Sequence, residues 1–403
     1  MRRSLLRLLL AFALCLPPLA RAAESQPGQA LVLGTKFPLR STILEEERAY
    51  LVYLPPDYET STARYPVLYL LDGDVNFHHT TGVVQFLFRN GHIPPMIVVG
   101  VSNTERTRDL TPPLLEGFRL PANPTKLARE VLPTAGGADR FLRFLEEELI
   151  PHIETRYRTL PYRVLVGHSY GGLFAIHTLM NRPQVFQAYL VISPSLWWND
   201  ELLTKGAPKA LSQLPAPERF LYLSMGGQEG QDMIQPIQRL ARTLEKAHPP
   251  GLRWRYVFLE KEHHGSTPLR TLYDGLELLF EGWRTPEWPA TPGTAAKIEA
   301  NYTLLSKRLG FEVRPDEDLL NDVGYQYLHA GKLDAALAAL RKNAEWYPHS
   351  ANVHDSLGEA LEAKGQLEAA RIEYQRAVEL DGQRPAYQKH LKAVSQKLAP
   401  VKE

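Results

Sequence analysis

The sequence has almost no cysteine, and the only one is Cys15. It lies in an N-terminal stretch with the three parts of a secretory signal peptide: early arginines, an apolar run over residues 8–16 and the small-residue pattern Ala20-Arg21-Ala22. We expect cleavage near Ala22 or Ala23, so that residues 1–23 are a signal peptide and the protein is secreted or periplasmic. The mature chain then holds neither a disulfide nor a cysteine-bound zinc site.

The sequence also lacks a long hydrophobic run and an excess of one charge. The apolar run of the leader is shorter than the roughly 20 residues that a spanning helix needs, and no later segment is apolar enough. Lysine and arginine number 46 against 45 acidic residues, and loss of the four leader arginines changes the net charge from +1 to −3. This balance offers no electrostatic case for nucleic acid as a partner. The 403 residues leave room for two domains.

Short β-rich runs alternate with longer helical ones from about residue 31 to residue 283, a pattern typical of strands joined by helices in one sheet. Strands are predicted over residues 48–54, 65–71, 96–101, 163–166, 188–192, 220–224 and 254–258, and an amphipathic helix over residues 139–157. The strands are nearly continuous in apolar residues, which indicates burial on both faces. We therefore predict an α/β fold with a mostly parallel sheet flanked by helices.

A proline-rich stretch over residues 283–293 breaks this pattern, and a different architecture follows. Four small or apolar residues recur there after 34 residues: Gly324, Gly331, Leu333 and Ala336 return as Gly358, Gly365, Leu367 and Ala370. This period resembles that of tetratricopeptide helix pairs. The predicted domains are residues 24–283 for the sheet, 284–315 for a linker and helix, and 316–403 for a small all-α domain of repeats. So short an array is expected to lean on the first domain or on a protein partner.

The motif with the clearest chemistry is Gly167-His168-Ser169-Tyr170-Gly171. It directly follows a predicted strand and directly precedes a helical run, which is the strand, turn and helix order of a nucleophile elbow. The sharp turn lifts a serine hydroxyl clear of the backbone. We predict that Ser169 is the nucleophile of an α/β-hydrolase.

A serine hydroxyl needs a base and a group that orients the base, and in this architecture the chain order is serine, acid, histidine. His263 and His264 follow the last strong strand, and we favour His264 because only one of two neighbouring side chains is expected to reach the serine. Glu229 and Asp232 are the candidate acids, with Glu229 preferred. The alternative is that either carboxylate merely begins the next helix.

The oxyanion that develops during acyl transfer needs preorganised donors. The backbone N–H of Tyr170, the residue after the nucleophile, is the expected first donor, and that of Asp74 or Val75 the second, by position after an early strand. Neither a metal nor an organic cofactor is implied.

Residues 49–280 resemble the esterase D family, which includes ferric-siderophore (enterochelin-type) esterases, feruloyl esterases, S-formylglutathione hydrolases and mycolyl transferases. The matching stretches are residues 65–73, 148–154, 167–174 and 193–198, and residues 103–112 and 264–266 resemble loops of the siderophore-esterase branch. The resemblance implies triad roles for Ser169, Glu229 and His264. His263 stands where relatives often carry an acidic residue.

Three aromatic or basic residues are candidates for substrate binding. Trp197, Trp198 and Arg106 would stack on an aromatic acyl group or pair with an acidic substrate; the alternative is that the tryptophans fill space and the arginine is solvated. The leading hypothesis is a secreted serine esterase that hydrolyses a carboxylic ester of siderophore type or of an aromatic acid through an acyl-enzyme on Ser169. The alternatives are acyl transfer by the same triad, or a non-catalytic adaptor that acts through the repeats.

Overall fold

The computed structural model of the protein describes residues 30–212, 214, 218–284, 291 and 293–399. The predicted signal peptide, with Cys15 and the expected cleavage site, lies outside these residues. Within the described part of the chain, no helix is long and apolar enough to cross a membrane.

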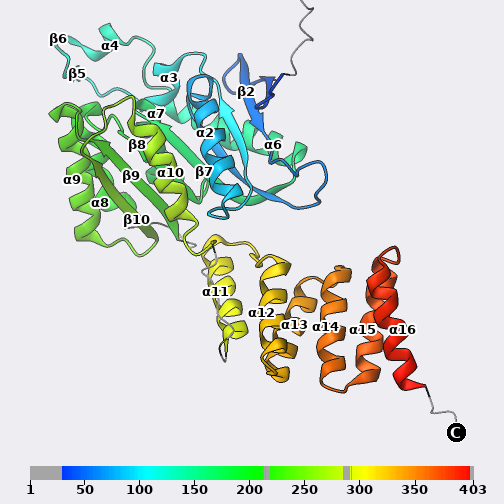
Figure 1. Ribbon diagram of the computed structural model, residues 1–403. Helices are drawn as coiled ribbons and strands as arrows, with labels where there is room; N and C mark the ends of the chain where they lie inside the picture. Colours follow the sequence, from blue (N-terminus) through cyan, green and yellow to red (C-terminus); the bar gives the residue numbers. More distant parts are fainter. Residues whose placement is uncertain (1–29, 213, 215–217, 285–290, 292, 400–403) are drawn as a thin grey trace, which may run out of the picture. The chain divides into compact units, whose positions relative to one another are not determined.

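An eight-stranded sheet forms the centre of the first domain (Figure 1). Its strands are β1 (Thr35–Arg40), β2 (Glu47–Tyr53), β3 (Tyr65–Leu70), β4 (Ile97–Val101), β7 (Thr159–His168), β8 (Ala188–Ile192), β9 (Arg219–Gly226) and β10 (Leu252–Leu259), and a separate hairpin pairs β5 (Arg119–Leu120) with β6 (Asn123–Leu127). The order in the large sheet is β1-β2-β4-β3-β7-β8-β9-β10. The pairs β1–β2 and β2–β4 are antiparallel and all others parallel, so the predicted mostly parallel sheet is confirmed.

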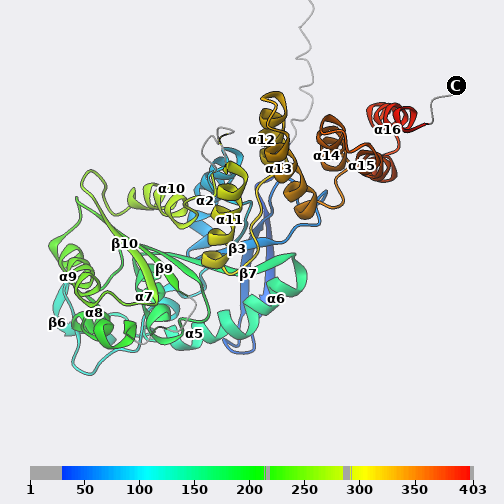
Figure 2. The ribbon, with the colours of Figure 1, turned by 90° about the horizontal axis from the view of Figure 1, so that it is seen from below.

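Helices cover both faces of the sheet (Figure 2). In chain order they are α2 (Gly73–Arg89), α3 (Arg106–Leu110), α4 (Ala128–Val131), α5 (Ala138–Phe144), the π-helical turn η1 (Leu145–Leu149), α6 (Ile150–Arg156), α7 (Tyr170–Asn181), α8 (Trp198–Leu211), α9 (Gln231–Ala247) and α10 (Thr267–Leu279). The helix predicted over residues 139–157 is thus α5, η1 and α6 in succession. Helices α2 and α10 lie on one face, and α5 to α9 on the other.

The alternation of side chains along each strand divides the core in two. All six residues of β3 are buried. Leu68 and Leu70 pack in one cluster with residues of α2 and α10, whereas Val67 and Tyr69 pack in the other with residues of α5 to α9. Successive side chains of a strand point to opposite faces, and both faces are covered here, which explains the near-continuous apolar strands of the sequence.

The C-terminal region is all-helical. It comprises α11 (Thr294–Leu309), α12 (Glu317–His329), α13 (Leu333–Trp346), α14 (Ala351–Ala363), α15 (Leu367–Leu380) and α16 (Pro385–Leu398). A Cβ added to Gly324 of α12 would lie 2.6 Å from Leu340 of α13, and one added to Gly358 of α14 would lie 2.6 Å from Tyr374 of α15. The same close approach therefore recurs after 34 residues, while the assignment to the tetratricopeptide family stays a prediction.

Helix α11 packs against the sheet domain. Its buried residues Ile298 and Tyr302 belong to the same hydrophobic cluster as Tyr162 and Phe280. Phe311, just after the helix, lies edge-on to Tyr162 at 5.7 Å between ring centroids. The predicted boundary at residue 283 therefore precedes a helix that shares a core with the first domain.

Candidate active site

The nucleophile elbow joins β7 to α7. Ser169 adopts φ 60° and ψ −116°, an unfavourable conformation for a residue with a side chain. A Cβ at Gly167 would overlap the carbonyl of Gly171, so only glycine fits there. The Ser169 amide donates a hydrogen bond to the Ile192 carbonyl at the end of β8, at 3.0 Å. The strained turn therefore holds the hydroxyl at the carboxyl edge of the sheet, beside the first turn of α7.

A histidine and a buried carboxylate meet at the same edge. His264 follows β10, Glu229 follows β9, and His264 Nδ1 lies 2.6 Å from Glu229 Oε2. The other carboxylate oxygen of Glu229 accepts hydrogen bonds from Ser193 Oγ at 2.5 Å and from the Gly226 amide at 3.2 Å. Burial raises the pKa of Glu229, but the hydrogen bonds from His264, Ser193 and Gly226 outweigh it and place the pKa below its usual value. Glu229 is therefore held as an anion.

The alternative residues point elsewhere. The exposed His263 accepts a hydrogen bond on Nδ1 from the Gly265 amide at 3.1 Å. Asp232 is exposed in the first turn of α9. Of the four candidates, the structure pairs His264 with Glu229.

A pocket of about 460 Å³ opens at this edge. It is lined by Ser169, Tyr170, Ser195, Trp197, Gln228, Glu229, Gly230, Met233, His263 and His264. The hydroxyl of Ser169 lies 3.4 Å from that of Ser195, and it makes this contact rather than one to His264. Catalytic hydrogen bonds are often long without substrate and tighten in the complex.

His168, inside the elbow motif, is a residue whose importance the sequence reasoning missed. Its ring centroid lies 4.3 Å from that of His264. Burial, and next the proximity of His264, lower the pKa of His168 to about 4, and its Nε2 is buried without a hydrogen-bond partner. A neutral ring is therefore packed against the face of His264. Only the fold could have revealed this contact, because the two residues are 96 positions apart.

The two predicted oxyanion donors lie in the first turns of helices, where amides have no partner within the helix. Tyr170 is the first residue of α7, and Asp74 is the second residue of α2. The two helices begin close together, because a Cβ added to Gly171 would contact the carboxylate of Asp72, the residue before α2. The amide positions therefore agree with the predicted roles, which stay predictions.

Two of the three predicted substrate contacts need correction. Trp198 is 1% exposed and donates from Nε1 to the Pro112 carbonyl at 3.1 Å, so it packs beneath the pocket instead of lining it. Arg106 binds both carboxylate oxygens of Asp72, at 2.6 and 2.9 Å, and donates to the His168 carbonyl at 3.2 Å. Its charge is therefore committed to holding the elbow and the start of α2 together.

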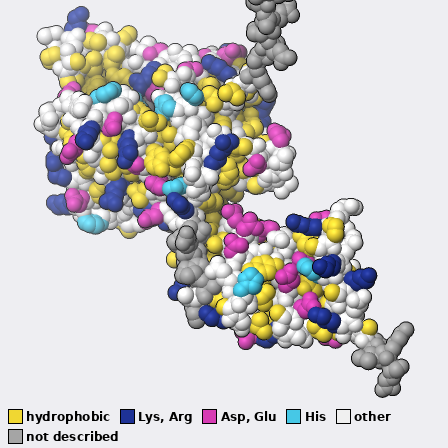
Figure 3. Space-filling model, in the orientation of Figure 1, with side chains coloured by type: hydrophobic (Ala, Val, Ile, Leu, Met, Phe, Trp, Pro, Cys, Tyr) yellow, Lys and Arg dark blue, Asp and Glu magenta, His cyan; other side chains and the backbone are white. Residues whose placement is uncertain are grey.

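Trp197 does line the pocket, and its Nε1 donates to the sulfur of Met233 at 3.1 Å. A second hollow of about 810 Å³ lies on the other side of His264, between α2 and α10. Its lining includes Val83 and Phe86 of α2 and Leu269 of α10, and Figure 3 shows hydrophobic side chains gathered over these helices. The candidate triad thus stands between two surfaces able to receive the two sides of an ester.

Comparisons with known proteins agree with this geometry. Residues 41–245 match the family described as putative esterase. The ferri-bacillibactin esterase BesA of Bacillus subtilis is 38% identical over 297 residues, which are 70% of this chain and 91% of the relative. The siderophore enterobactin esterase of Emericella nidulans is 33% identical over 189 residues, and the match spans 42% of this chain and 60% of that relative.

A solved structure shares the fold. The crystal structure of an IroE-like serine hydrolase from Shewanella oneidensis superposes with a TM-score of 0.68 and 29% identity. The match covers 78% of this chain and 99% of that one. The α/β-hydrolase fold predicted from the sequence is thereby confirmed.

Proposed function

This chain belongs to the putative esterase family, and from that premise we propose that it is a secreted serine esterase that forms an acyl-enzyme on Ser169. The observation that carries the proposal is the 2.6 Å contact between His264 Nδ1 and the Glu229 carboxylate, in the pocket that also contains Ser169. The family membership makes the chain a carboxylic-ester hydrolase; the assignment of roles is ours.

In the first half-reaction, Ser169 Oγ attacks the ester carbonyl carbon while His264 Nε2 takes its proton. Glu229 holds Nδ1–H and stabilises the imidazolium that forms. The amides of Tyr170 and Asp74 donate to the oxyanion. His264 then protonates the departing alkoxide as the C–O bond breaks, leaving an acyl ester on Ser169.

In the second half-reaction, water enters at the position of the alcohol. His264 accepts a proton from the water as it attacks the acyl carbon, and returns a proton to Ser169 Oγ as the acid leaves. His168 stays neutral beside the imidazolium, since its lowered pKa disfavours a second positive charge there. The pair of histidines therefore carries one charge at most during the cycle.

The proposed substrate is an ester of siderophore type or of an aromatic acid. The printed name of the Bacillus subtilis relative specifies ferri-bacillibactin, and that of the Emericella nidulans relative specifies enterobactin. Trp197 supports the aromatic option, because it presents an indole in the pocket beside Ser169. Any iron would arrive as part of the substrate.

The proposed location is outside the cytoplasm, in the periplasm or the medium. It rests on the arginines, apolar run and small residues of the first 23 positions. The C-terminal helices would remain attached to the mature enzyme, where binding of a protein partner is the additional role we propose for them.

The first experiment is hydrolysis of p-nitrophenyl butyrate by the mature chain beside Ser169→Ala. We expect turnover by the parent and at least a ~1000-fold lower kcat in the variant, as when a triad member is removed. A fluorophosphonate probe should label Ser169 in the parent and in Ser195→Ala, the neighbouring serine. If a folded parent neither turns over the ester nor takes up the probe, the proposal is wrong.

A further inference from the structure

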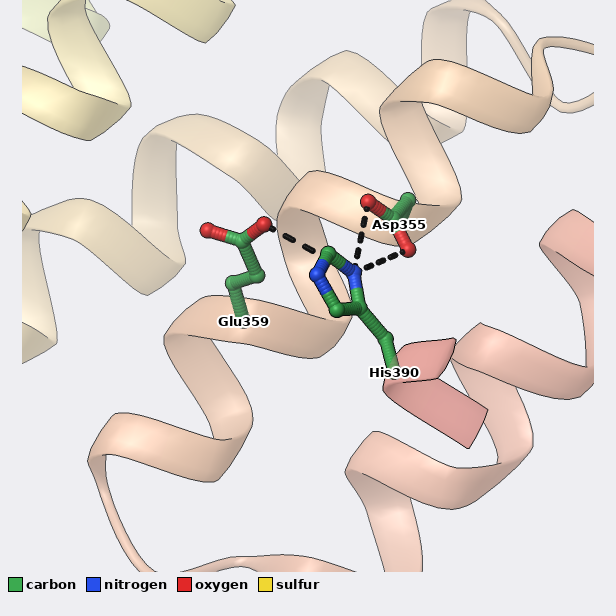
Figure 4. A group of neighbouring side chains, drawn as sticks. All are labelled: Asp355, Glu359 and His390. Carbon is green, nitrogen blue, oxygen red and sulfur yellow. Dashed lines mark hydrogen bonds and ion pairs between the residues drawn. The ribbon is translucent and has the colours of Figure 1, made fainter. Parts of the chain in front are cut away.

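Three potential metal ligands converge in the C-terminal helices, far along the chain from the triad (Figure 4). Asp355 and Glu359 lie one turn apart on α14, and His390 reaches them from α16. His390 Nδ1 lies 2.9 and 3.1 Å from the two Asp355 oxygens and 3.8 Å from Glu359 Oε1. One ligand atom from each residue lies within 4.8 Å of the others, and this is the group of its kind found among the described residues.

The cluster departs from the repeat that surrounds it. At the positions 34 residues earlier, the chain carries Asn321, Tyr325 and Ser356. There the Tyr325 hydroxyl donates to Ser356 Oγ at 3.2 Å, so the first interval joins its helices by an uncharged hydrogen bond. The second interval places a carboxylate and an imidazole at those two positions, which packing alone does not require.

The charges of the cluster are incompletely balanced by the protein. Asp355 is 7% exposed, and burial raises its pKa despite the hydrogen bond from His390. Burial also raises the pKa of Glu359, and repulsion by Asp355 adds to it. The next carboxylate on α14, Glu362, is already paired with Lys397. Two carboxylates thus share one imidazole, with Arg384 as a weaker and more distant charge.

We propose that Asp355, Glu359 and His390 bind a divalent first-row transition-metal ion, with Zn²⁺ as its probe. One imidazole nitrogen with carboxylate oxygens suits such an ion, whereas Ca²⁺ and Mg²⁺ prefer oxygen alone. Ligands of tetrahedral zinc stand about 3.3 Å apart. The distances of 2.9 and 3.8 Å from His390 Nδ1 bracket that value, so small side-chain rotations complete three corners and water supplies the fourth.

The ion would join α14 to α16. Helix α16 is the last described helix of the chain and is buried mainly through Tyr387 and Val394. A metal held by both helices would therefore stabilise the C-terminal end of the array, since binding free energy to a folded site is folding free energy. This role is independent of the proposed esterase activity.

Calorimetric titration of the metal-free mature chain with Zn²⁺ tests the proposal. We expect one saturable site that is at least ~10-fold weaker in His390→Ala and in Asp355→Asn, since even loss of a ligand's hydrogen-bond partner costs about that much. The matched control is His354→Ala, because His354 pairs with Glu373 and the Pro348 carbonyl outside the cluster. Unchanged hydrolysis of p-nitrophenyl butyrate shows that each variant is folded.

Trypsin provides a second readout. Cleavage at Lys389 and Lys392 of α16 should slow when Zn²⁺ is added to the parent and to His354→Ala, but not to His390→Ala. Zinc binding that is equal in all variants, or no saturable binding by the parent, overturns the proposal. Neither result bears on Ser169.

Discussion

Glu229 is the buried carboxylate that we propose orients His264, and its surroundings define a test. Glu229→Gln keeps the shape but removes the charge, and it presents an amide where Ser193 and Gly226 now donate. We expect kcat for p-nitrophenyl butyrate to fall about 10³- to 10⁴-fold, as for the acid of other triads. Asp232→Asn is the matched control and should keep parental kcat, because Asp232 is exposed on α9. A larger loss in Asp232→Asn than in Glu229→Gln would reverse the assignment.

His168 makes the stability of the fold depend on pH. Its pKa is about 4 in the fold and about 6.5 in a free chain, so between these values the unfolded state binds more protons. The contribution of His168 is fully present above pH ~6.5 and is lost as the pH falls toward 4. At pH 5 the loss is about 2 kcal/mol. Urea unfolding at pH 7.5 and pH 5 should therefore show a smaller decrease in His168→Gln than in the parent.

His78→Gln is the control for that experiment, because His78 is an exposed histidine on the first helix of the domain, α2. It should reproduce the pH dependence of the parent. Equal pH dependence in all three proteins would show that His168 titrates alike in the folded and unfolded chains.

The sequence allowed the main site residues to be predicted because chain order and motif constrain them. Ser169 stands in a motif between a strand and a helix, and His264 and Glu229 follow the expected strands. The contacts of Ser193 with Glu229, and of His168 with His264, depend on loops that meet only in the folded protein. The error at Trp198 has the same origin, because two adjacent indoles give no indication of which one faces inward.

At the scale of elements, the helical glycines divide into two kinds. Gly358 of α14 faces the ring of Tyr374, and an added Cβ would lie 2.6 Å away, whereas one at Gly82 of α2 would meet nothing within 4 Å. Gly358→Ala should reduce the free energy of unfolding by about 1–3 kcal/mol through overpacking. Gly82→Ala should raise it by about 0.5–1 kcal/mol through helix propensity. Chemical denaturation measures both; a stabilising Gly358→Ala would mean that α14 and α15 are not closely packed.

Elements with strong apolar patterns were predicted to within a few residues, and weaker ones were missed. The strand predicted over residues 188–192 coincides with β8, which is buried throughout. The strand β1 was not predicted, because it lies at the sheet edge and its residues are exposed or half-buried. The π-helical turn η1 was also missed, since a single wide turn leaves the amphipathic pattern of its helix almost unchanged.

For the whole molecule, the packing of α11 predicts where the chain can be shortened. A chain that ends after Trp283 exposes the surface that Ile298 and Tyr302 cover, whereas one that ends after Arg314 keeps it covered. We expect the shorter chain to unfold at least ~5 °C lower, because several buried apolar side chains are lost. The longer truncation should retain parental kcat. Thermal melts and turnover measure the two effects, and equal melting temperatures would mean that α11 contributes nothing to the first domain.

The strand β1 has a consequence for how copies of the protein meet in solution. Open sheet edges offer unpaired amides and carbonyls to a strand of another molecule. Pro38 leaves one position of β1 without an amide hydrogen, and the exposed Lys36 adds a charge to the same edge. The first strand therefore acts as a stop that keeps the sheet from growing, molecule by molecule, into a continuous fibre.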